Sequence, residues 1–361
     1  MTEQLVDRFG RVHRDLRISL TDRCSLRCTY CMPADGVPWL ARSTMLSTEE
    51  IVHVARVGVD LGITEIRLTG GEPLLRVDIV DVVRRLTALS GPAGSPEVSL
   101  TTNALRLPGL ASDLVDAGLS RVNISLDTLE RAKFLQLTRR DKLVETLAGI
   151  AAADAAGLHP VKINAVAMRG VNDDEVVALT RFAVERGYQM RFIEQMPLDA
   201  GHTWDRAEMV TQAEILARLR AVFRLEEVPG RGAAPAELWT VDGGPATVGV
   251  IASVTAPFCG ACDRLRLTAD GQLRSCLFSQ TETNVRDLLR GSGQPPAEVG
   301  IGPGQALRIG ATAPERPVPV ADVDLALAGA YRRCLAGKKA GHDIDDPAFL
   351  QPDRPMSAIG G

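Results

Sequence analysis

The chain has 361 residues, a formal net charge of -4 and 24% charged residues. This length allows one large core of the barrel type with additions, or two domains. Because there is no overall basic field, bulk nucleic-acid binding is not expected, and a polyanion would need a local group of arginines. The sequence has no apolar signal core and no run of eighteen apolar residues, so we expect a cytoplasmic protein that makes no membrane contact.

Apolar, β-rich runs alternate with helical patterns through the first 200 residues. A strand at 16–20 precedes a helix over about 47–61, whose STEE start is typical of a capped helix. Further strands are expected at 65–71, 97–103, 121–127, 160–168 and 189–196, with helices near 76–89, 110–117, 130–156 (two) and 173–186. This alternation predicts an α/β fold with a parallel sheet, most economically an incomplete (β/α)6 TIM-like barrel; an open doubly wound sheet is the alternative.

Beyond residue 200 the pattern changes to short strands, glycine-rich turns and a second group of cysteines. We therefore expect a barrel core over 1–200 and a C-terminal region over 201–361 that closes over the rim. The stretch 291–320, rich in Gly and Pro, is expected to be a linker or a long loop. Polar residues at the carboxyl ends of the strands should meet at one rim, where the working site of such folds lies.

Six of the seven cysteines form two groups of three, namely Cys24, Cys28 and Cys31, and then Cys259, Cys262 and Cys276. Clustered cysteines in a reducing compartment indicate metal ligation or catalysis rather than disulfides. Three thiolates on one loop can hold three irons of a cubane cluster and leave the fourth iron open to a small molecule. A zinc site with a remote fourth ligand is the alternative, completed in the second group by Cys334.

The first cysteine loop, with Tyr30 before its last cysteine, and the segment TGGEP at 69–73 resemble the radical S-adenosylmethionine enzymes. The resemblance implies a [4Fe-4S] cluster on Cys24, Cys28 and Cys31 whose open iron binds S-adenosyl-L-methionine. It also implies a cofactor site lined by Tyr30, Gly71, Ser125 and Met196.

Narrower matches are RISLTDRC, RLTGGEPLLR, RFIEQMP, CGACDRLRLTADGQLRSCL and a terminal Gly360-Gly361. Over essentially the whole length, they resemble the GTP 3′,8-cyclase family of molybdenum cofactor biosynthesis. This implies a second [4Fe-4S] cluster, on the second cysteine group, whose free iron contacts the guanine ring of GTP. It implies GTP contacts from Arg17, Arg67, Thr101, Lys162, Arg191, Arg264, Leu265 and Arg266, with Arg266 also in a catalytic role.

The basic residues of this set have a physical rationale of their own. Four fall on predicted strands of a parallel sheet, where charge is costly unless it is paired: Arg17, Arg67, Lys162 and Arg191. Arg264 and Arg266 stand two apart on a further strand and therefore share a face. A triphosphate would supply the countercharge, because the planar guanidinium matches phosphate oxygens.

The resemblance further implies that a 5′-deoxyadenosyl radical abstracts hydrogen from C3′ of GTP, after which C3′ joins C8. It implies a reductant such as flavodoxin or ferredoxin, a product passed to cyclic pyranopterin monophosphate synthase, and a monomer or homodimer. A peptide-modifying radical enzyme and a non-catalytic zinc protein are the alternatives.

Two residues depart from the family pattern. Glu65 stands where some members place a lysine, so one phosphate contact is either missing or supplied elsewhere. Ala104 replaces the usual glycine, which predicts a backbone without positive φ. We interpret Cys334 as structural or incidental, and we expect the Gly360-Gly361 tail to reach the active site.

Overall fold

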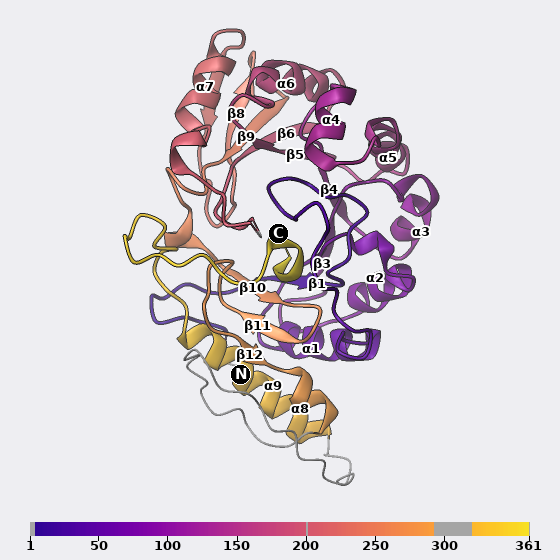
Figure 1. Ribbon diagram of the computed structural model, residues 1–361. Helices are drawn as coiled ribbons and strands as arrows, with labels where there is room; N and C mark the ends of the chain where they lie inside the picture. Colours follow the sequence, from indigo (N-terminus) through magenta and orange to yellow (C-terminus); the bar gives the residue numbers. More distant parts are fainter. Residues whose placement is uncertain (1–3, 200, 292–319, 361) are drawn as a thin grey trace.

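The computed structural model describes residues 4–199, 201–291 and 320–360. One sheet runs through them in the order β12-β11-β10-β1-β2-β3-β4-β5-β6-β9-β8-β7, and β1 to β6 are parallel neighbours. Figure 1 shows this sheet curved into an open barrel, with α1 to α6 on its outer side. The predicted incomplete barrel is confirmed. Most of the expected linker lies outside the described residues.

The strands predicted in the first 200 residues are present, with their ends shifted by a few residues: β1 Asp15–Ser19, β2 Glu65–Thr69, β3 Glu97–Thr102, β4 Arg121–Ser125, β5 Lys162–Ala167 and β6 Gln189–Glu194. The helices between them are α1 Thr48–Asp60, α2 Ile79–Thr87, α3 Ala111–Asp116, α4 Arg131–Thr138, α5 Leu143–Ala155 and α6 Val176–Glu185. The STEE start of α1 is the predicted cap, because Ser47 and Glu50 exchange side-chain and backbone hydrogen bonds.

The C-terminal region extends the sheet at both edges, which the sequence did not predict. Its strands are β7 Leu225–Val228, β8 Glu237–Val241, β9 Thr247–Ile251, β10 Arg264–Leu267, β11 Gln272–Arg274 and β12 Thr283–Asn284. Its helices are α7 Gln212–Arg220, α8 Arg286–Arg290, α9 Val320–Ala336 and α10 Met356–Ile359. Strand β9 pairs in parallel with β6, and β10 pairs in parallel with β1. One sheet therefore contains strands from both sides of residue 200, and the division into two regions at that residue stays a prediction.

Short 3-10 helices occupy several of the loops: η1 Pro73–Leu75, η2 Leu107–Gly109, η3 Asp173–Glu175, η4 Arg206–Glu208 and η5 Cys259–Ala261.

The alternation of side chains along each strand determines which residues face the barrel interior. On β1, Leu16 and Ile18 are fully buried in the hydrophobic core, and Arg17 between them points to the opposite face. Arginines on these strands are thus directed inward by the burial of their apolar neighbours.

The prediction that Ala104 has no positive φ is wrong, because its φ is 67°. Ala104 makes a tight turn after β3, in which its N–H donates to Thr102 Oγ1 at 3.0 Å. Its methyl group fits because α5 carries Gly149 opposite, where a Cβ would lie 2.7 Å from the Ala104 Cβ. A residue with a Cβ costs about 1–2 kcal/mol in this left-handed conformation.

Helix α9 is joined to α1 through Tyr331, whose side chain is fully buried. The Tyr331 hydroxyl donates to Val54 O at 3.0 Å. Gly58 on α1 provides the space, since a Cβ there would lie 2.8 Å from the Tyr331 hydroxyl oxygen. Cys334 on the same helix lies in the hydrophobic core, which agrees with a structural role.

We expect Tyr331→Ala to lower the free energy of unfolding by about 3–5 kcal/mol, because it leaves a cavity between α1 and α9. Tyr331→Phe should cost only about 1 kcal/mol, because it keeps the ring and loses one hydrogen bond. Urea unfolding measures both. Leu325→Ala, at a position on α9 that is 72% exposed, is the control; an equal loss there would show that Tyr331 has no special part in the docking of α9.

Candidate active site

The first cysteine loop follows β1, and its three cysteines are half-buried free thiols. Cys24 Sγ accepts hydrogen bonds from Leu26 N at 3.4 Å and from Asn103 Nδ2 at 3.9 Å. Burial raises the pKa of Cys28, and it raises the pKa of Cys31 to about 12. Deprotonating these thiols therefore needs a cation, and a metal ligated by them would supply it.

The GGEP segment packs backbone to backbone against this loop. Gly71 N donates to Thr21 O and Glu72 N donates to Arg23 O, both at 2.7 Å. A Cβ on Gly71 would lie 2.3 Å from Arg23 O, so only glycine fits. The buried Glu72 carboxylate accepts from Thr102 Oγ1 at 2.7 Å and from Asn103 N at 2.8 Å, which ties the loops after β1, β2 and β3 together.

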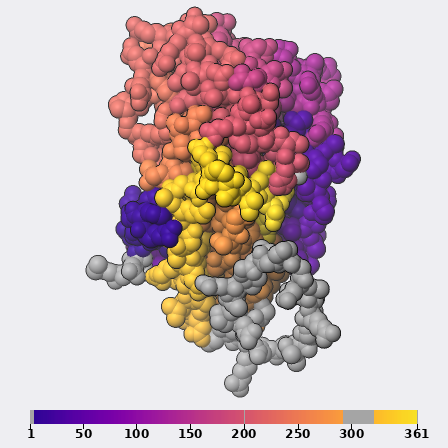
Figure 2. Space-filling model, turned by 60° about the vertical axis from the view of Figure 1, so that its left-hand side comes forward, coloured from indigo at the N-terminus to yellow at the C-terminus, as the bar shows by residue number. Residues whose placement is uncertain are grey.

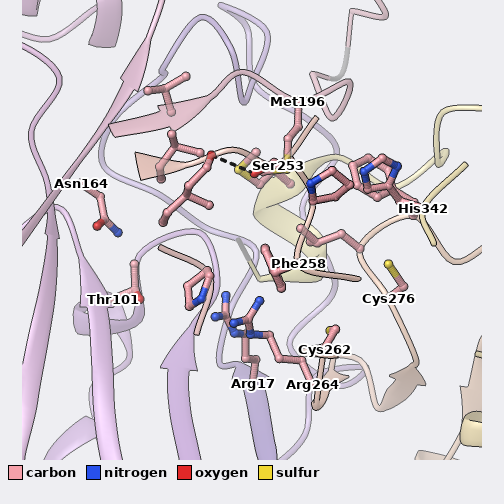
Figure 3. A pocket seen from close by; sticks show the side chains of 18 of the residues that line it. Arg17, Thr101, Asn164, Met196, Ser253, Phe258, Cys262, Arg264, Cys276 and His342 are labelled. Atoms are coloured by element: carbon pink, nitrogen blue, oxygen red, sulfur yellow. Dashed lines mark hydrogen bonds between the residues drawn. The ribbon is translucent and has the colours of Figure 1, made fainter. Parts of the chain in front are cut away.

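A row of arginines crosses the inner face of the barrel. The register places Arg266 on β10, Arg17 on β1 and Arg67 on β2 side by side. These three, with Arg191 and Arg264, line one cavity, and Figure 3 shows Arg17 and Arg264 directed into it. Burial and neighbouring guanidinium groups lower the pKa of Arg191 to about 9 and that of Arg266 to about 10. Both stay charged at pH 7, which makes the cavity a site for an anion.

Asp15 is the carboxylate that pairs with this row in the described structure. Its Oδ2 lies 3.3 Å from Arg264 Nε and 3.6 Å from Arg17 Nε. Although burial acts in the opposite direction, the charges of Arg17, Arg67 and Arg264 lower the pKa of Asp15. One carboxylate offsets part of the positive charge. Asp15 was not predicted from the sequence, although its position two residues before Arg17 on the same strand face could have indicated it.

Two of the predicted GTP contacts are not among the residues that line the cavity: Lys162 and Leu265. Burial and the charges of Arg191, Arg121 and Arg67 lower the pKa of Lys162 to about 8, so a nearby anion would relieve an unfavourable charge. The Leu265 side chain is fully buried in the hydrophobic core, which argues against a side-chain contact with substrate.

The carboxylate of Glu65 is paired with Arg121 on β4, at 3.3 Å. Arg121 also forms an ion pair with Glu97. Glu65 is therefore held by neighbouring strands at the start of the barrel, and the cations of the cavity do not need to neutralise it. Glu65, which stands where some family members have a lysine, thus has an ion-pair partner on β4.

The second cysteine group lies on the opposite wall from Thr101 and Asn164, as Figure 3 shows. Cys259 is in η5, Cys262 ends it, and Cys276 follows β11; all three line the cavity. Among the described residues, no group of three or more Cys, His, Asp or Glu is placed to hold a single metal ion. A cubane cluster is wider than one ion, so it can bridge thiols that stand farther apart.

Three of the predicted cofactor contacts line the same cavity: Tyr30, Ser125 and Met196. Tyr30 hydroxyl donates to Asp127 Oδ2 at 2.8 Å, and burial raises the pKa of Asp127 to about 6. Gly71 lies outside the lining, beneath the cysteine loop. Thr101, for which a GTP contact is predicted, also lines the cavity. Further lining residues were not predicted from the sequence, among them Asn123, Asn164, Ser253, Phe258 and His342. Strand alternation could have found the two asparagines.

The C-terminal tail enters the barrel, as predicted, through Gly360; Gly361 lies outside the described residues. Figure 1 shows α10 at the centre of the barrel opening. Arg266 Nη1 donates to Gly360 O. Gly360 has a φ of 74°, and a Cβ there would lie 2.6 Å from Thr69 Cγ2, so both conformation and space require glycine.

An incomplete barrel with three thiols on the loop after its first strand defines the class of radical S-adenosylmethionine enzymes, and the chain matches the Radical SAM superfamily over residues 18–183. It also matches the Molybdenum Cofactor Synthesis C family over residues 188–298. It is 53% identical over 360 residues to GTP 3′,8-cyclase of Streptomyces coelicolor, covering 99% of this chain and 96% of that protein. The chain belongs to the GTP 3′,8-cyclase family.

A second relative is GTP 3′,8-cyclase 2 of Mycobacterium tuberculosis, 51% identical over 366 residues, covering 100% of this chain and 93% of that protein. Among solved structures, SuiB of Streptococcus suis superposes with a TM-score of 0.54 at 14% identity, covering 76% of this chain and 64% of that one. That likeness concerns the fold alone. None of the helices within the described ranges is both long enough and apolar enough to span a bilayer.

We expect Asp15→Asn to lower the free energy of unfolding by about 3–5 kcal/mol at pH 7, because it leaves buried guanidinium groups without their carboxylate. The folded-state pKa of Asp15 is depressed, so its contribution is present above the unfolded-state pKa and is lost as the pH falls through the folded-state value. The difference from the wild type should shrink below about pH 4. Urea unfolding at several pH values measures this.

Asp116→Asn, at an exposed position on α3, is the matched control and should change stability little at any pH. A loss for Asp15→Asn that persists unchanged in acid would mean that packing, rather than charge, is responsible.

Proposed function

We propose that the protein converts GTP to (8S)-3′,8-cyclo-7,8-dihydroguanosine 5′-triphosphate with S-adenosyl-L-methionine, the first step of molybdenum cofactor biosynthesis. The observation that carries the proposal is a single cavity lined by five buried or half-buried arginines, by the second cysteine group and by Tyr30 of the first cysteine loop. The guanidinium groups suit a triphosphate, and the thiols suit a cluster beside the base. The relatives named GTP 3′,8-cyclase support this substrate.

The residues present fit two [4Fe-4S] clusters and S-adenosyl-L-methionine. Each donor set consists of three free cysteines, and Gly71 keeps the space under the first loop clear of a side chain. When bound, the first cluster and the cofactor supply a carbon radical able to remove hydrogen from C3′ of GTP. Tyr30, Ser125 and Met196, which line the cavity, would hold the cofactor.

The chain's own part is to bind and orient the substrate. Arg17, Arg67 and Arg264 would hold phosphate oxygens, with Lys162 and Arg191 contributing positive charge. Thr101 would contact GTP across the cavity from the second cluster. Arg266 is the proposed catalytic residue, because its buried guanidinium lines the cavity and is fixed by Gly360 O. Such a fixed positive charge can stabilise a stage of the reaction at which the substrate is anionic or more basic.

The partners follow from this chemistry. We expect a low-potential reductant such as flavodoxin or ferredoxin, and transfer of the product to cyclic pyranopterin monophosphate synthase. The free thiols suit the reducing cytoplasm. The chain would act as a monomer or homodimer. Anaerobic incubation with GTP, S-adenosyl-L-methionine and dithionite, followed by mass spectrometry of the products, tests the proposal; a failure to consume GTP while the cofactor is cleaved would contradict it.

Replacement of Cys24, Cys28 or Cys31 by Ala should abolish formation of 5′-deoxyadenosine, because an open iron needs all three thiolates around it. Cys276→Ala should instead lose GTP cyclisation and keep some cofactor cleavage. Liquid chromatography of both products measures the difference. Cys334→Ala is the control, since this core cysteine should leave both products unchanged. Normal cyclisation by Cys276→Ala would assign the second group a structural role.

Removal of residues 360 and 361 should strongly lower cyclisation while cluster content, melting temperature and GTP affinity stay near the wild-type values. The reason is that Gly360 O fixes the Arg266 guanidinium. Gly360→Val should have a similar effect, because its Cβ would collide with Thr69. Single-turnover product formation and isothermal titration with GTP separate the two readouts. An unchanged rate would exclude a role of the tail in turnover.

A further inference from the structure

Lys338 is a buried lysine that lies just after α9 and that the proposed reaction does not use. It is 3% exposed, and its backbone N–H donates to Leu335 O at 2.9 Å at the helix end. Its Nζ donates to Arg264 O at 2.7 Å and to Ser275 O at 2.9 Å, and lies 3.6 Å from Cys262 Sγ. A side chain that carries a charge is seldom buried to this extent without a specific partner.

The three contacts use the whole donor capacity of the ammonium group, which has three N–H bonds. Both carbonyls belong to residues beside the second cysteine group. Arg264 follows Cys262 by two positions, and Ser275 immediately precedes Cys276. One ammonium group therefore joins the β10 and β11 segments that carry two of the three thiols, and it touches one of those thiols directly.

No carboxylate is among the contacts described for Lys338 Nζ. The neighbouring Lys339 differs from Lys338 in burial and in its partner. It is exposed, and it forms an ion pair with Asp343 at 2.8 Å. Burial of an ammonium ion costs several kcal/mol, which neutral carbonyls offset only in part. The Cys262 thiol, as a thiolate bound to iron, is the negative charge that the structure places beside it.

The backbone of Cys259, which carries the third thiol of the group, is also bound by a cation. Arg11 Nη1 donates to Cys259 O at 2.6 Å, and Arg11 Nη2 donates to Lys339 O at 2.8 Å. Figure 2 shows the indigo N-terminal residues against the yellow C-terminal residues. The segment that carries Lys338 is thus anchored next to Cys259 as well, so the position of its ammonium group is fixed relative to all three thiols.

We propose that Lys338 is a positioning residue for the second cluster: its ammonium holds the Cys262 and Cys276 segments together and provides a fixed positive charge beside the cluster. The inference rests on the proposed presence of that cluster. A positive charge beside a cluster favours the reduced, more negative state, so it raises the reduction potential. In this chain the charge acts on the cluster that would face the guanine ring.

The test uses the full-length protein, purified and reconstituted without oxygen. Lys338→Met removes both the hydrogen bonds and the charge, Lys338→Gln keeps two donors without the charge, and Lys338→Arg keeps the charge. Lys339→Met is the matched control on the adjacent, exposed residue. The wild type should contain about eight irons per chain, four for each cluster. We expect about four irons in Lys338→Met, and wild-type iron content in Lys339→Met.

The reduction potential is measured separately, by a redox titration followed by electron paramagnetic resonance. The chains used also carry Cys24→Ala, Cys28→Ala and Cys31→Ala, so that only the second cluster contributes to the signal. Lys338→Gln should destabilise the reduced cluster at least tenfold, which is a shift of about 59 mV to lower potential for one electron. Lys338→Arg should restore a potential near that of the wild type.

Wild-type iron content and potential in both Lys338→Met and Lys338→Gln would overturn the inference, and so would equal losses in Lys339→Met. Only four irons in the wild type would overturn the second cluster itself, and the inference with it. Retained 5′-deoxyadenosine formation and an unchanged melting temperature in Lys338→Met would show that the barrel and the first cluster remain intact, and that the loss is confined to the second site.

Discussion

The rest of the structure depends on a buried row of positive charge. Arg266, Arg17 and Arg67 lie side by side on three parallel strands, and Asp15 offsets only part of their charge. Like charges at this spacing repel each other, and burial removes the water that would screen them. The barrel tolerates the arrangement because its apolar residues face outward to the helices, and because an anionic substrate can complete the charge balance.

The C-terminal region is part of the catalytic architecture. Strand β10 pairs with β1 and brings Arg264 and Arg266 next to Arg17. The loop before β10 carries Cys259 and Cys262, and the loop after its partner strand β11 carries Cys276. The tail then enters the barrel and contacts Arg266 through Gly360. In the proposed function, one strand of four residues would therefore link the substrate phosphates, the second cluster and the chain terminus.

Around both cysteine groups, fixed backbone contacts prepare the site. The first loop is held by the GGEP segment, whose buried Glu72 joins the ends of three strands. The second group is held by two cations, Arg11 and Lys338, that bind carbonyls beside the thiols. Cations bind carbonyls at the first loop as well, because Arg27 Nη1 donates to Cys24 O at 2.7 Å and Arg139 Nη1 donates to Met32 O at 3.0 Å. Lys338 differs from these arginines because its ammonium also lies 3.6 Å from a thiol, that of Cys262.

The sequence by itself determined the six-stranded barrel, the capped α1, both cysteine groups and most of the cavity arginines, because alternation of apolar residues and short motifs are local signals. Only the tertiary structure decided that β9 and β10 extend the sheet, that Asp15 and Lys338 are buried beside the site, and that Leu265 faces the core. The positive φ of Ala104 depended on Gly149, far away in the chain. Strand pairing, buried charge and shared space arise between distant segments, and a local pattern carries no record of which segments meet.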